Sequence, residues 1–279
     1  MRDRRDVDRE FAQLAAIPEE LIDLGRATLL VARDLDSTCD IAASLALLDE
    51  MAAPLSGQAA RELPPERAAA LLKEHVFERL GFCGNDEDYF DPRNSLLHEV
   101  LSRRTGIPIT LGIAALEIAR RAGIAAFGIG FPGHFLVGVG KRDRCILIDP
   151  FHGGRRLNAH TLTELLRGVA GPDARVLPEH LRPAGKRAII MRLLANLKGV
   201  YVRRREGLNL LCVLDRLIGL EPGASKEVRD RGLVYADLGC FGPARDDLSA
   251  YLARVPDAAD AEEVRGLLAQ VSRRAATLN

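Results

Sequence analysis

Between positions 5 and 80, apolar residues recur every three to four positions, which is the spacing of one helix face. The pattern predicts helices over residues 18–35, 41–55 and 64–80, and Pro18 would occupy a first-turn position that a helix tolerates. This region contains no stretch in which apolar and polar residues alternate as they do in a half-buried strand. It is therefore predicted to be helical.

The middle of the chain changes to the pattern of short strands. Residues 125–131, 134–140 and 144–149 alternate or run apolar over a few positions, and a helix is predicted before them from about Pro108 to Gly123. Only the turn-like residues 140–143 separate the last two strands, so these strands are expected to form an antiparallel hairpin. The middle of the chain is thus predicted to be α+β.

The register of this hairpin follows if a symmetric four-residue loop closes it. Opposed residues then have numbers that sum to 283, so Val137 faces Ile146 and His134 faces Asp149. Directly opposed side chains on one face lie about 4.5–5.5 Å apart at Cβ, which is close enough for a carboxylate to orient an imidazole. The strand pattern alone therefore predicts a His134–Asp149 pair.

A helical pattern returns from Lys186 onward and repeats with a period of 34 residues. This period is typical of tetratricopeptide repeats, in which a helical hairpin recurs and each unit buries its apolar face against the next. Two units are predicted, at about 194–222 and 228–256, followed by a capping helix at 259–276. The matching pairs are Tyr201 and Tyr235, Leu214 and Leu248, and Pro222 and Pro256.

These patterns divide the chain into four parts. A helical N-terminal region is expected at 1–80, an α+β core with a small antiparallel sheet at 81–170, a connection rich in Pro and Gly at 171–190, and all-α repeats at 191–279. A chain of 279 residues has ample length for such a division.

Charge and cysteine content restrict the possible partners and compartment. Lys plus Arg equals Asp plus Glu at 39 each, so no overall field attracts nucleic acid or an anionic membrane. The basic run at 186–205 lacks interleaved aromatic residues and is expected to be a solvated helix face. The five cysteines show no CxxC spacing and are expected to be reduced thiols. The chain has no apolar stretch long enough to span a membrane, and its start is charged, so the sequence predicts a cytoplasmic protein.

The His134–Asp149 pair resembles two-thirds of a catalytic triad, which would need a nucleophile to complete it. Cysteine hydrolases of the papain-like and transglutaminase-like types place the cysteine at a helix N-terminus, where the helix dipole favours the thiolate. The helix that precedes the hairpin has no cysteine there. Thr110 is the hydroxyl at its start, either as a nucleophile or as a cap. Cys83 precedes a different helix, and Cys145 is expected to point into the core.

Other polar residues offer weaker candidates. Asp91, Arg93 and Asn94 combine a turn with a helix start, so they form either a structural corner or part of the lining of the His–Asp cleft. His98 and His152 have no partner at a metal-ligand spacing such as HExxH. The sequence therefore predicts neither a metal nor a cofactor.

Three long motifs, YFDPRNSLLHEVLSRRTGIPITL, FPGHFLVGV and ILIDPFHGG, resemble the bacterial SirB-type family, and LLANLKGVYVRRRE with RDRGLVYADLG resembles its C-terminal half. The resemblance covers roughly residues 60–256. It implies a transglutaminase-like, papain-like core followed by tetratricopeptide repeats. The resemblance also implies that His134 and Asp149 correspond to the histidine and aspartate of transglutaminases. The position of the transglutaminase cysteine would fall near Pro108 to Thr110, where this chain has no cysteine.

Two functional hypotheses follow. The first is a non-catalytic transglutaminase-like protein, a pseudoenzyme that acts as a cytoplasmic protein-interaction or regulatory module and binds a protein partner through its repeats. The second is a hydrolase or acyltransferase in which His134 is the base, Asp149 orients it, and Thr110 or water is the nucleophile. The missing cysteine favours the first hypothesis, and the retained pair motivates the second. Neither hypothesis involves nucleic acid or a membrane.

Overall fold

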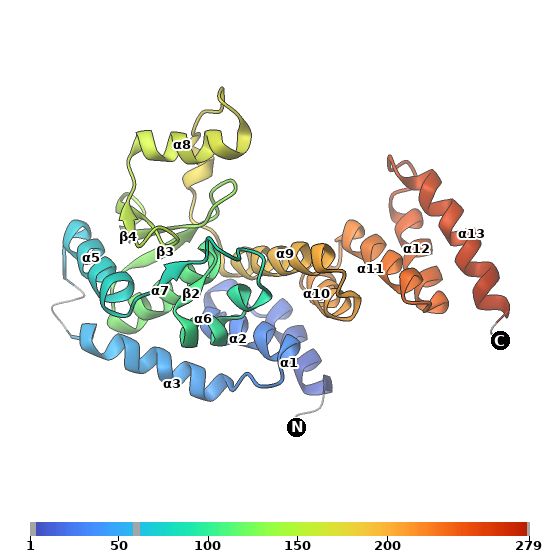
Figure 1. The fold of residues 1–279 in the computed structure, drawn as a ribbon, viewed down its shortest axis with the longest axis horizontal. Coiled ribbons are helices and arrows are strands. Elements are labelled where there is room, and N and C mark those ends of the chain that lie inside the picture. Colours follow the sequence, from blue (N-terminus) through green and yellow to red (C-terminus); the bar gives the residue numbers. More distant parts are fainter. Residues whose placement is uncertain (1–3, 58–61, 278–279) are drawn as a thin grey trace. The chain divides into compact units, whose positions relative to one another are not determined.

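The structure, a computed structural model, describes residues 4–57 and 62–277 and contains two compact units (Figure 1). One unit is Pro18–Leu193, and the other combines Met1–Ile17 with Leu194–Asn279. The helices of the first unit are η1 Glu19–Leu21, α2 Leu24–Leu35, α3 Ile41–Ala52, η2 Ala53–Leu55, α5 Pro65–Leu72, η3 Lys73–Arg79, η4 Pro92–Ser95, α6 Leu97–Arg103, α7 Pro108–Ala122, α8 Ala159–Ala170 and η5 Pro178–Leu181.

The N-terminal helices follow the apolar pattern with one correction. The single helix predicted over residues 18–35 is wrong, because the chain forms a short 3-10 turn and then starts α2 at Leu24. The side chain of Asp23 caps α2 by accepting a hydrogen bond of 2.9 Å from the backbone N–H of Arg26. A capped start is a local signal that overrides the continuous apolar spacing.

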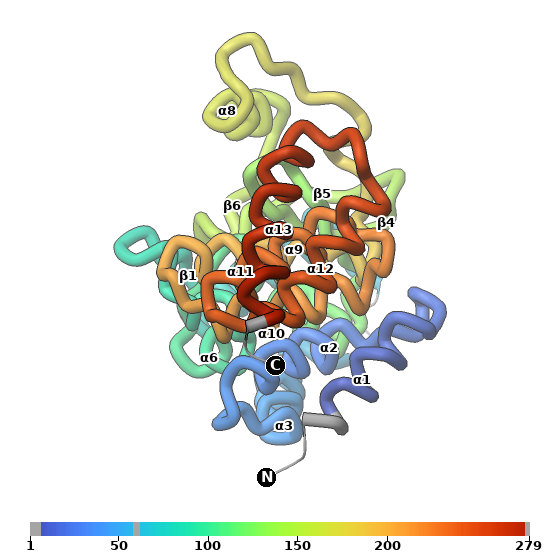
Figure 2. The backbone as a smooth tube through the Cα atoms, turned by 90° about the vertical axis from the view of Figure 1, so that its right-hand side faces the viewer, coloured from blue at the N-terminus to red at the C-terminus, as the bar shows by residue number. Residues whose placement is uncertain are grey.

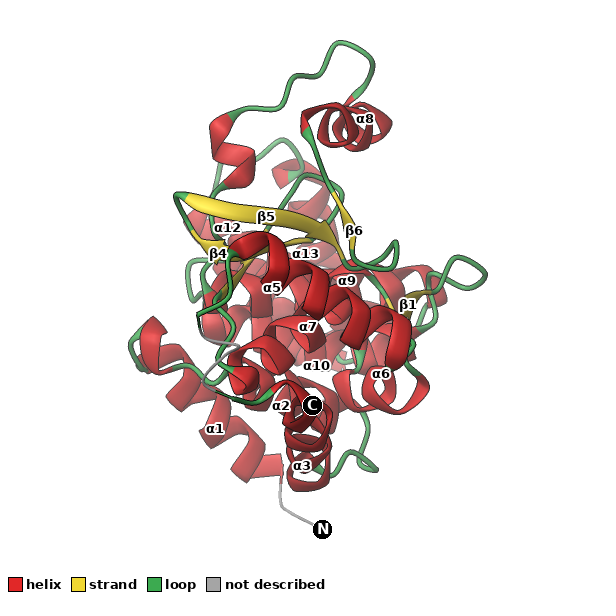
Figure 3. Cartoon of the chain, turned by 90° about the vertical axis from the view of Figure 1, so that its left-hand side faces the viewer, coloured by secondary structure: helices red, strands yellow, loops and turns green. Residues whose placement is uncertain are grey.

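The central sheet is antiparallel with strand order β3-β4-β5-β6. Helices α5 and α7 pack on the sheet, and α8 lies on the opposite side from α7 (Figure 3). A separate pair of short parallel strands joins the loop before α6 to the loop before α7. The strands are β1 Cys83–Gly84, β2 Thr105–Gly106, β3 Ala126–Ile129, β4 Leu136–Lys141, β5 Arg144–Asp149 and β6 Arg155–Arg156.

The hairpin of β4 and β5 exists, but its predicted register is wrong. Val137 faces Ile148 rather than Ile146, and the ladder continues to the pair Lys141 and Arg144. The loop therefore has two residues instead of four. Gly140, which looked like a turn residue in the sequence, lies within the strand with φ of 118°, a conformation that glycine adopts readily. The shift is an even number of residues, so each side chain stays on its predicted face.

Helix α7 is the central helix of this unit, and nearly all of its residues are buried. Its acidic residue Glu117 is 2% exposed and forms ion pairs with Arg120 and Arg121. Gly112 lies against the ring of Phe135, where a Cβ would come within 2.5 Å of that ring. The apolar character of α7 thus serves core packing.

No helix among the described residues is both long and apolar enough to cross a membrane.

The other unit contains the predicted repeats. Its helices are α1 Arg4–Ala16, the C-terminal part of α9 Lys186–Arg204, α10 Gly207–Leu220, α11 Ser225–Asp237, α12 Phe241–Arg254 and α13 Ala261–Thr277. Helices α11, α12 and α13 pack side by side in chain order (Figure 1), and α13 lies in front of the other two in Figure 2. Leu214 and Leu248, one repeat apart, are both completely buried. Arg231 bonds to Asp215 at 2.8 Å and to Asp247 at 2.7 Å, which links three successive helices.

Candidate functional site

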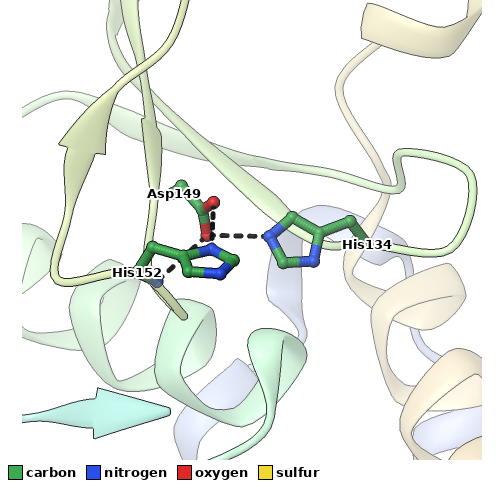
Figure 4. A group of neighbouring side chains, drawn as sticks. All are labelled: His134, Asp149 and His152. Carbon is green, nitrogen blue, oxygen red and sulfur yellow. Dashed lines mark hydrogen bonds and ion pairs between the residues drawn. The ribbon is translucent and has the colours of Figure 1, made fainter. Parts of the chain in front are cut away.

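The structure brings His134 and Asp149 together. The Nε2 atom of His134 lies 2.7 Å from Oδ1 of Asp149, and both residues are buried (Figure 4). His134 precedes β4 instead of lying within it, so it reaches the carboxylate from a turn. The Nδ1 atom of His134 makes no hydrogen bond to any described residue and is therefore open to a further partner.

Asp149 is the centre of the site and is fully buried at the end of β5. The backbone N–H groups of Phe151 and His152 donate to its Oδ1 at 3.1 and 3.3 Å. Burial alone would raise the pKa of Asp149, but the hydrogen bonds and charge of His134 and His152 outweigh burial and hold that pKa at about 2. Asp149 is therefore an ionised acceptor at neutral pH.

A short turn fixes the position of His134. Its backbone N–H donates to the carbonyl of Phe131 at 3.0 Å, and Gly133 supplies a φ of 66° that permits the turn. Arg192 then donates to the carbonyls of Phe131 and His134 at 2.9 and 2.6 Å. Because the guanidinium bonds to both ends of the turn, it orients the imidazole without touching it.

His152 is a member of the site that the sequence reasoning did not place there. Its Nδ1 lies 2.7 Å from Oδ2 of Asp149, so each carboxylate oxygen faces a separate histidine (Figure 4). Arg155 approaches the same Oδ2 at 3.4 Å. The spacing of Asp149 and His152, three residues apart in a turn, was the available signal. This spacing predicts that His152 meets Asp149 only if the chain bends back at Gly153 and Gly154, both of which have positive φ.

Two groups of described residues have ligand atoms close enough to hold a metal ion. In each group the candidate atoms all lie within 4.8 Å of one another. One is the buried cluster around Asp149, with both of its histidines. The other joins Asp36, His98 and Glu99, where Nε2 of His98 lies 3.2 Å from Asp36.

Aromatic rings form one wall of the site. The centroid of the Phe151 ring lies 6.2 Å from that of the His134 ring and 5.2 Å from that of the His152 ring, and both pairs are edge-on. The ring centroids of Tyr89 and Phe151 are 6.0 Å apart, and those of Tyr89 and the partly exposed Phe90 are 5.4 Å apart. The loop before α6 therefore reaches the site through Tyr89.

Thr110 has no exposed surface. Its hydroxyl donates to the carbonyl of Asn94 at 2.6 Å and accepts from the N–H of Ile107, the residue that caps α7, at 3.2 Å. Both functions of the hydroxyl are thus used by the backbone. This is the arrangement of a capping side chain at the third position of a helix.

Asp91, Arg93 and Asn94 form a corner beside the start of α7. Asp91 accepts from the backbone N–H of Arg93 at 3.0 Å and pairs with its guanidinium at 2.7 Å. The completely buried Asn94 donates to the carbonyl of Asp88 at 2.7 Å. Among the contacts of the described residues, none joins these three side chains to His134 or Asp149 directly.

The two cysteines considered as nucleophiles do not contact His134 in the described part of the chain. The thiol of Cys83 is exposed, and its Sγ lies 3.8 Å from Oγ1 of Thr105. Cys145 is four residues from Asp149 on β5, or about 13 Å along a strand. Burial and the charge of Asp143 raise the pKa of Cys145, so its thiolate is disfavoured.

Comparison with known proteins identifies two families along the chain. Residues 42–195 match the transglutaminase-like superfamily, and residues 197–269 match the tetratricopeptide repeat. The chain is 38% identical to a UPF0162 protein of Xylella fastidiosa over 263 residues, which cover 93% of each chain. It is 31% identical to Protein SirB1 of Salmonella typhimurium over 66% of this chain and 68% of the relative.

Among solved structures, menin matches with a TM-score of 0.40 and 10% sequence identity, over 89% of this chain and 69% of the menin chain. The two family matches and the observed helices and strands confirm the predicted α+β fold with its C-terminal repeats. The chain therefore belongs to the transglutaminase-like superfamily, in the SirB-type family that joins this domain to tetratricopeptide repeats.

Proposed function

We propose that this chain is a non-catalytic transglutaminase-like protein that binds a protein partner through its repeats in the cytoplasm. The environment of Thr110 carries the first part of the proposal. A nucleophile must approach its substrate, yet this hydroxyl is fully buried and hydrogen-bonded to the backbone on both sides. No thiol occupies the start of α7, where the superfamily reaction would need one.

A groove in the repeat unit supports the second part. It has a volume of about 630 Å³ and lies against α9, the start of α10 and α11. Val202 and Leu238 line it and are 55% and 42% exposed. Arg205 and Asp237 line it as well, and neither forms an ion pair with another described residue. Exposed apolar groups flanked by free charges of both signs suit a peptide segment of mixed composition.

The cysteines support the cytoplasmic location in the proposal, and the basic run at 186–205 supports a protein partner over nucleic acid. No disulfide joins cysteines in the described part of the chain, which a reducing compartment favours. Several cations of the run 186–205 already have partners within their own unit. Lys186 donates to the carbonyl of Ile22 at 2.6 Å, and Lys198 pairs with Asp230 at 2.6 Å. A nucleic-acid surface would need these charges to be free.

The groove is tested by capture of the partner in cells. Tagged full-length chains are cross-linked and purified, and the bound proteins are quantified by mass spectrometry. Val202→Asp and Leu238→Asp are compared with Leu208→Asp, an equally drastic change at a residue that is 72% exposed and outside the groove. We expect the groove variants to lose the partner by about tenfold or more, as for central interface residues. The Leu208 control and Thr110→Ala should retain it.

Groove variants that keep every partner, or a control that loses as much, would contradict the proposal. Circular dichroism of each purified variant separates loss of the fold from loss of binding.

The His134–Asp149 contact favours a second candidate, a hydrolase or acyltransferase that activates water or Thr110. The 2.7 Å bond at Nε2 leaves Nδ1 open, as a general base requires. A screen of ester, thioester and amide substrates would support this candidate if it finds turnover that His134→Ala abolishes. Turnover that persists in Thr110→Ala would identify water as the nucleophile.

A further inference from the structure

The cluster around Asp149 holds one histidine more than a catalytic pair needs. A base and its orienting carboxylate use one oxygen of Asp149, here the Oδ1 that faces His134 at 2.7 Å. The second oxygen faces Nδ1 of His152, also at 2.7 Å, and the two imidazole rings lie 5.9 Å apart (Figure 4). His152 has no role in either functional candidate.

Two imidazoles and one carboxylate are a donor set that binds first-row divalent metal ions such as Zn²⁺. The candidate ligand atoms of His134, Asp149 and His152 all lie within 4.8 Å of one another. We propose that these three side chains bind one divalent transition-metal ion. The inference is independent of partner binding by the repeats and would stand if that proposal failed.

Two of the three ligands are already fixed by their surroundings. Asp149 is held by backbone N–H groups, and the turn that carries His134 is fastened by Arg192. Preset ligands reduce the cost of assembling a metal site. The Phe151 ring, edge-on to both imidazoles, supplies an apolar surround that strengthens the attraction between the cation and its ligands.

The third ligand provides access. The side chain of His152 is 42% exposed, whereas those of His134 and Asp149 are 10% and 0% exposed. An ion can therefore approach from the side of His152. Solvent on that side can supply the remaining ligand, since three protein ligands leave a position open.

Arg155 gives the proposal a signature that a purely structural cluster would lack. Its guanidinium lies 3.4 Å from Oδ2 of Asp149 and is 46% exposed. A bound cation would repel this group and compete with it for the same oxygen. Removing Arg155 should thus strengthen metal binding by about two- to fivefold, the range expected for a partly exposed ion pair.

The test uses the full chain after treatment with a chelator and its removal. Co²⁺ is titrated and followed by its visible absorption, and Zn²⁺ binding is measured by calorimetry. We expect one ion per chain and at least about tenfold weaker binding in His134→Ala and His152→Ala. Arg155→Ala should bind more tightly. His160→Ala, a change at a histidine whose side chain is 80% exposed on α8, should bind as the wild type does.

His152→Ala decides the test, because this partly exposed residue can be changed with least risk to the core. Thermal unfolding without metal checks that each variant is folded. The proposal is overturned if the wild type binds neither ion, if His152→Ala binds as tightly as the wild type, or if Arg155→Ala weakens binding.

Discussion

Thr110→Val tests whether the hydroxyl at the start of α7 is structural. Valine nearly matches threonine in volume, so the change removes the hydroxyl and little else. The carbonyl of Asn94 then loses a donor 2.6 Å away, and the N–H of Ile107 loses an acceptor 3.2 Å away. Water cannot easily replace either bond, because Thr110 is completely buried.

The size of the effect follows from these two bonds. A buried polar group left without a partner costs about 1–3 kcal/mol, so two such groups lower the free energy of unfolding by roughly 3 kcal/mol, allowing for partial relaxation. For a domain of about 150–250 residues, each kcal/mol moves the melting temperature by about 2–4 °C. We therefore expect the transition of the unit Pro18–Leu193 to fall by about 6–12 °C.

Differential scanning calorimetry of the full chain at neutral pH measures this shift. Thr163→Val is the matched control, because the hydroxyl of Thr163 also donates to a backbone carbonyl, that of Ala159 at 2.8 Å, but near solvent. The control should change the melting temperature by less than about 2 °C. Thr110→Ser keeps the hydroxyl and should recover most of the loss. A Thr110→Val transition within about 2 °C of wild type would refute the structural role.

Two further predictions concern packing and thiol reactivity. Gly112→Ala should destabilise the protein by about 1–3 kcal/mol, because the added Cβ would lie 2.5 Å from the Phe135 ring. Gly219→Ala, in open space on α10, should instead be neutral or stabilising by up to about 1 kcal/mol, as urea unfolding can measure. Burial raises the pKa of Cys39 to about 12, so at pH 8 iodoacetamide should alkylate the exposed Cys83 well before Cys39, as peptide mass spectrometry can follow.

The elements that the sequence predicted correctly are those with a repeated local pattern. The 34-residue spacing found the two helical hairpins because equivalent residues such as Leu214 and Leu248 must both be buried. Residues 18–35 show the limit of such a pattern. Their apolar spacing is continuous, but Asp23 offers a capping carboxylate that starts α2 afresh at Leu24.

The site was harder to predict because its residues meet through turns. Asp149 could be placed on a strand, whereas His152 lies in the bend beyond it, at Gly153 and Gly154, and no periodicity describes such a bend. Likewise, Arg192 is far along the chain from His134 and looked like one cation in a basic run. Only the folded chain brings it to the carbonyl of His134 at 2.6 Å.

The His134–Asp149 contact was predicted from a register that proved wrong, and the reason bears on the site. The shift of two residues along β5 leaves Asp149 on its predicted face. The position opposite Asp149, however, now lies just beyond the first pair of the ladder, Val137 and Ile148, and is no longer that of His134. His134 recovers the contact from the turn at Gly133, outside the ladder. The geometry of the pair therefore depends on this turn and on the guanidinium of Arg192 that fastens it, so changes there should move the imidazole while leaving the hairpin intact.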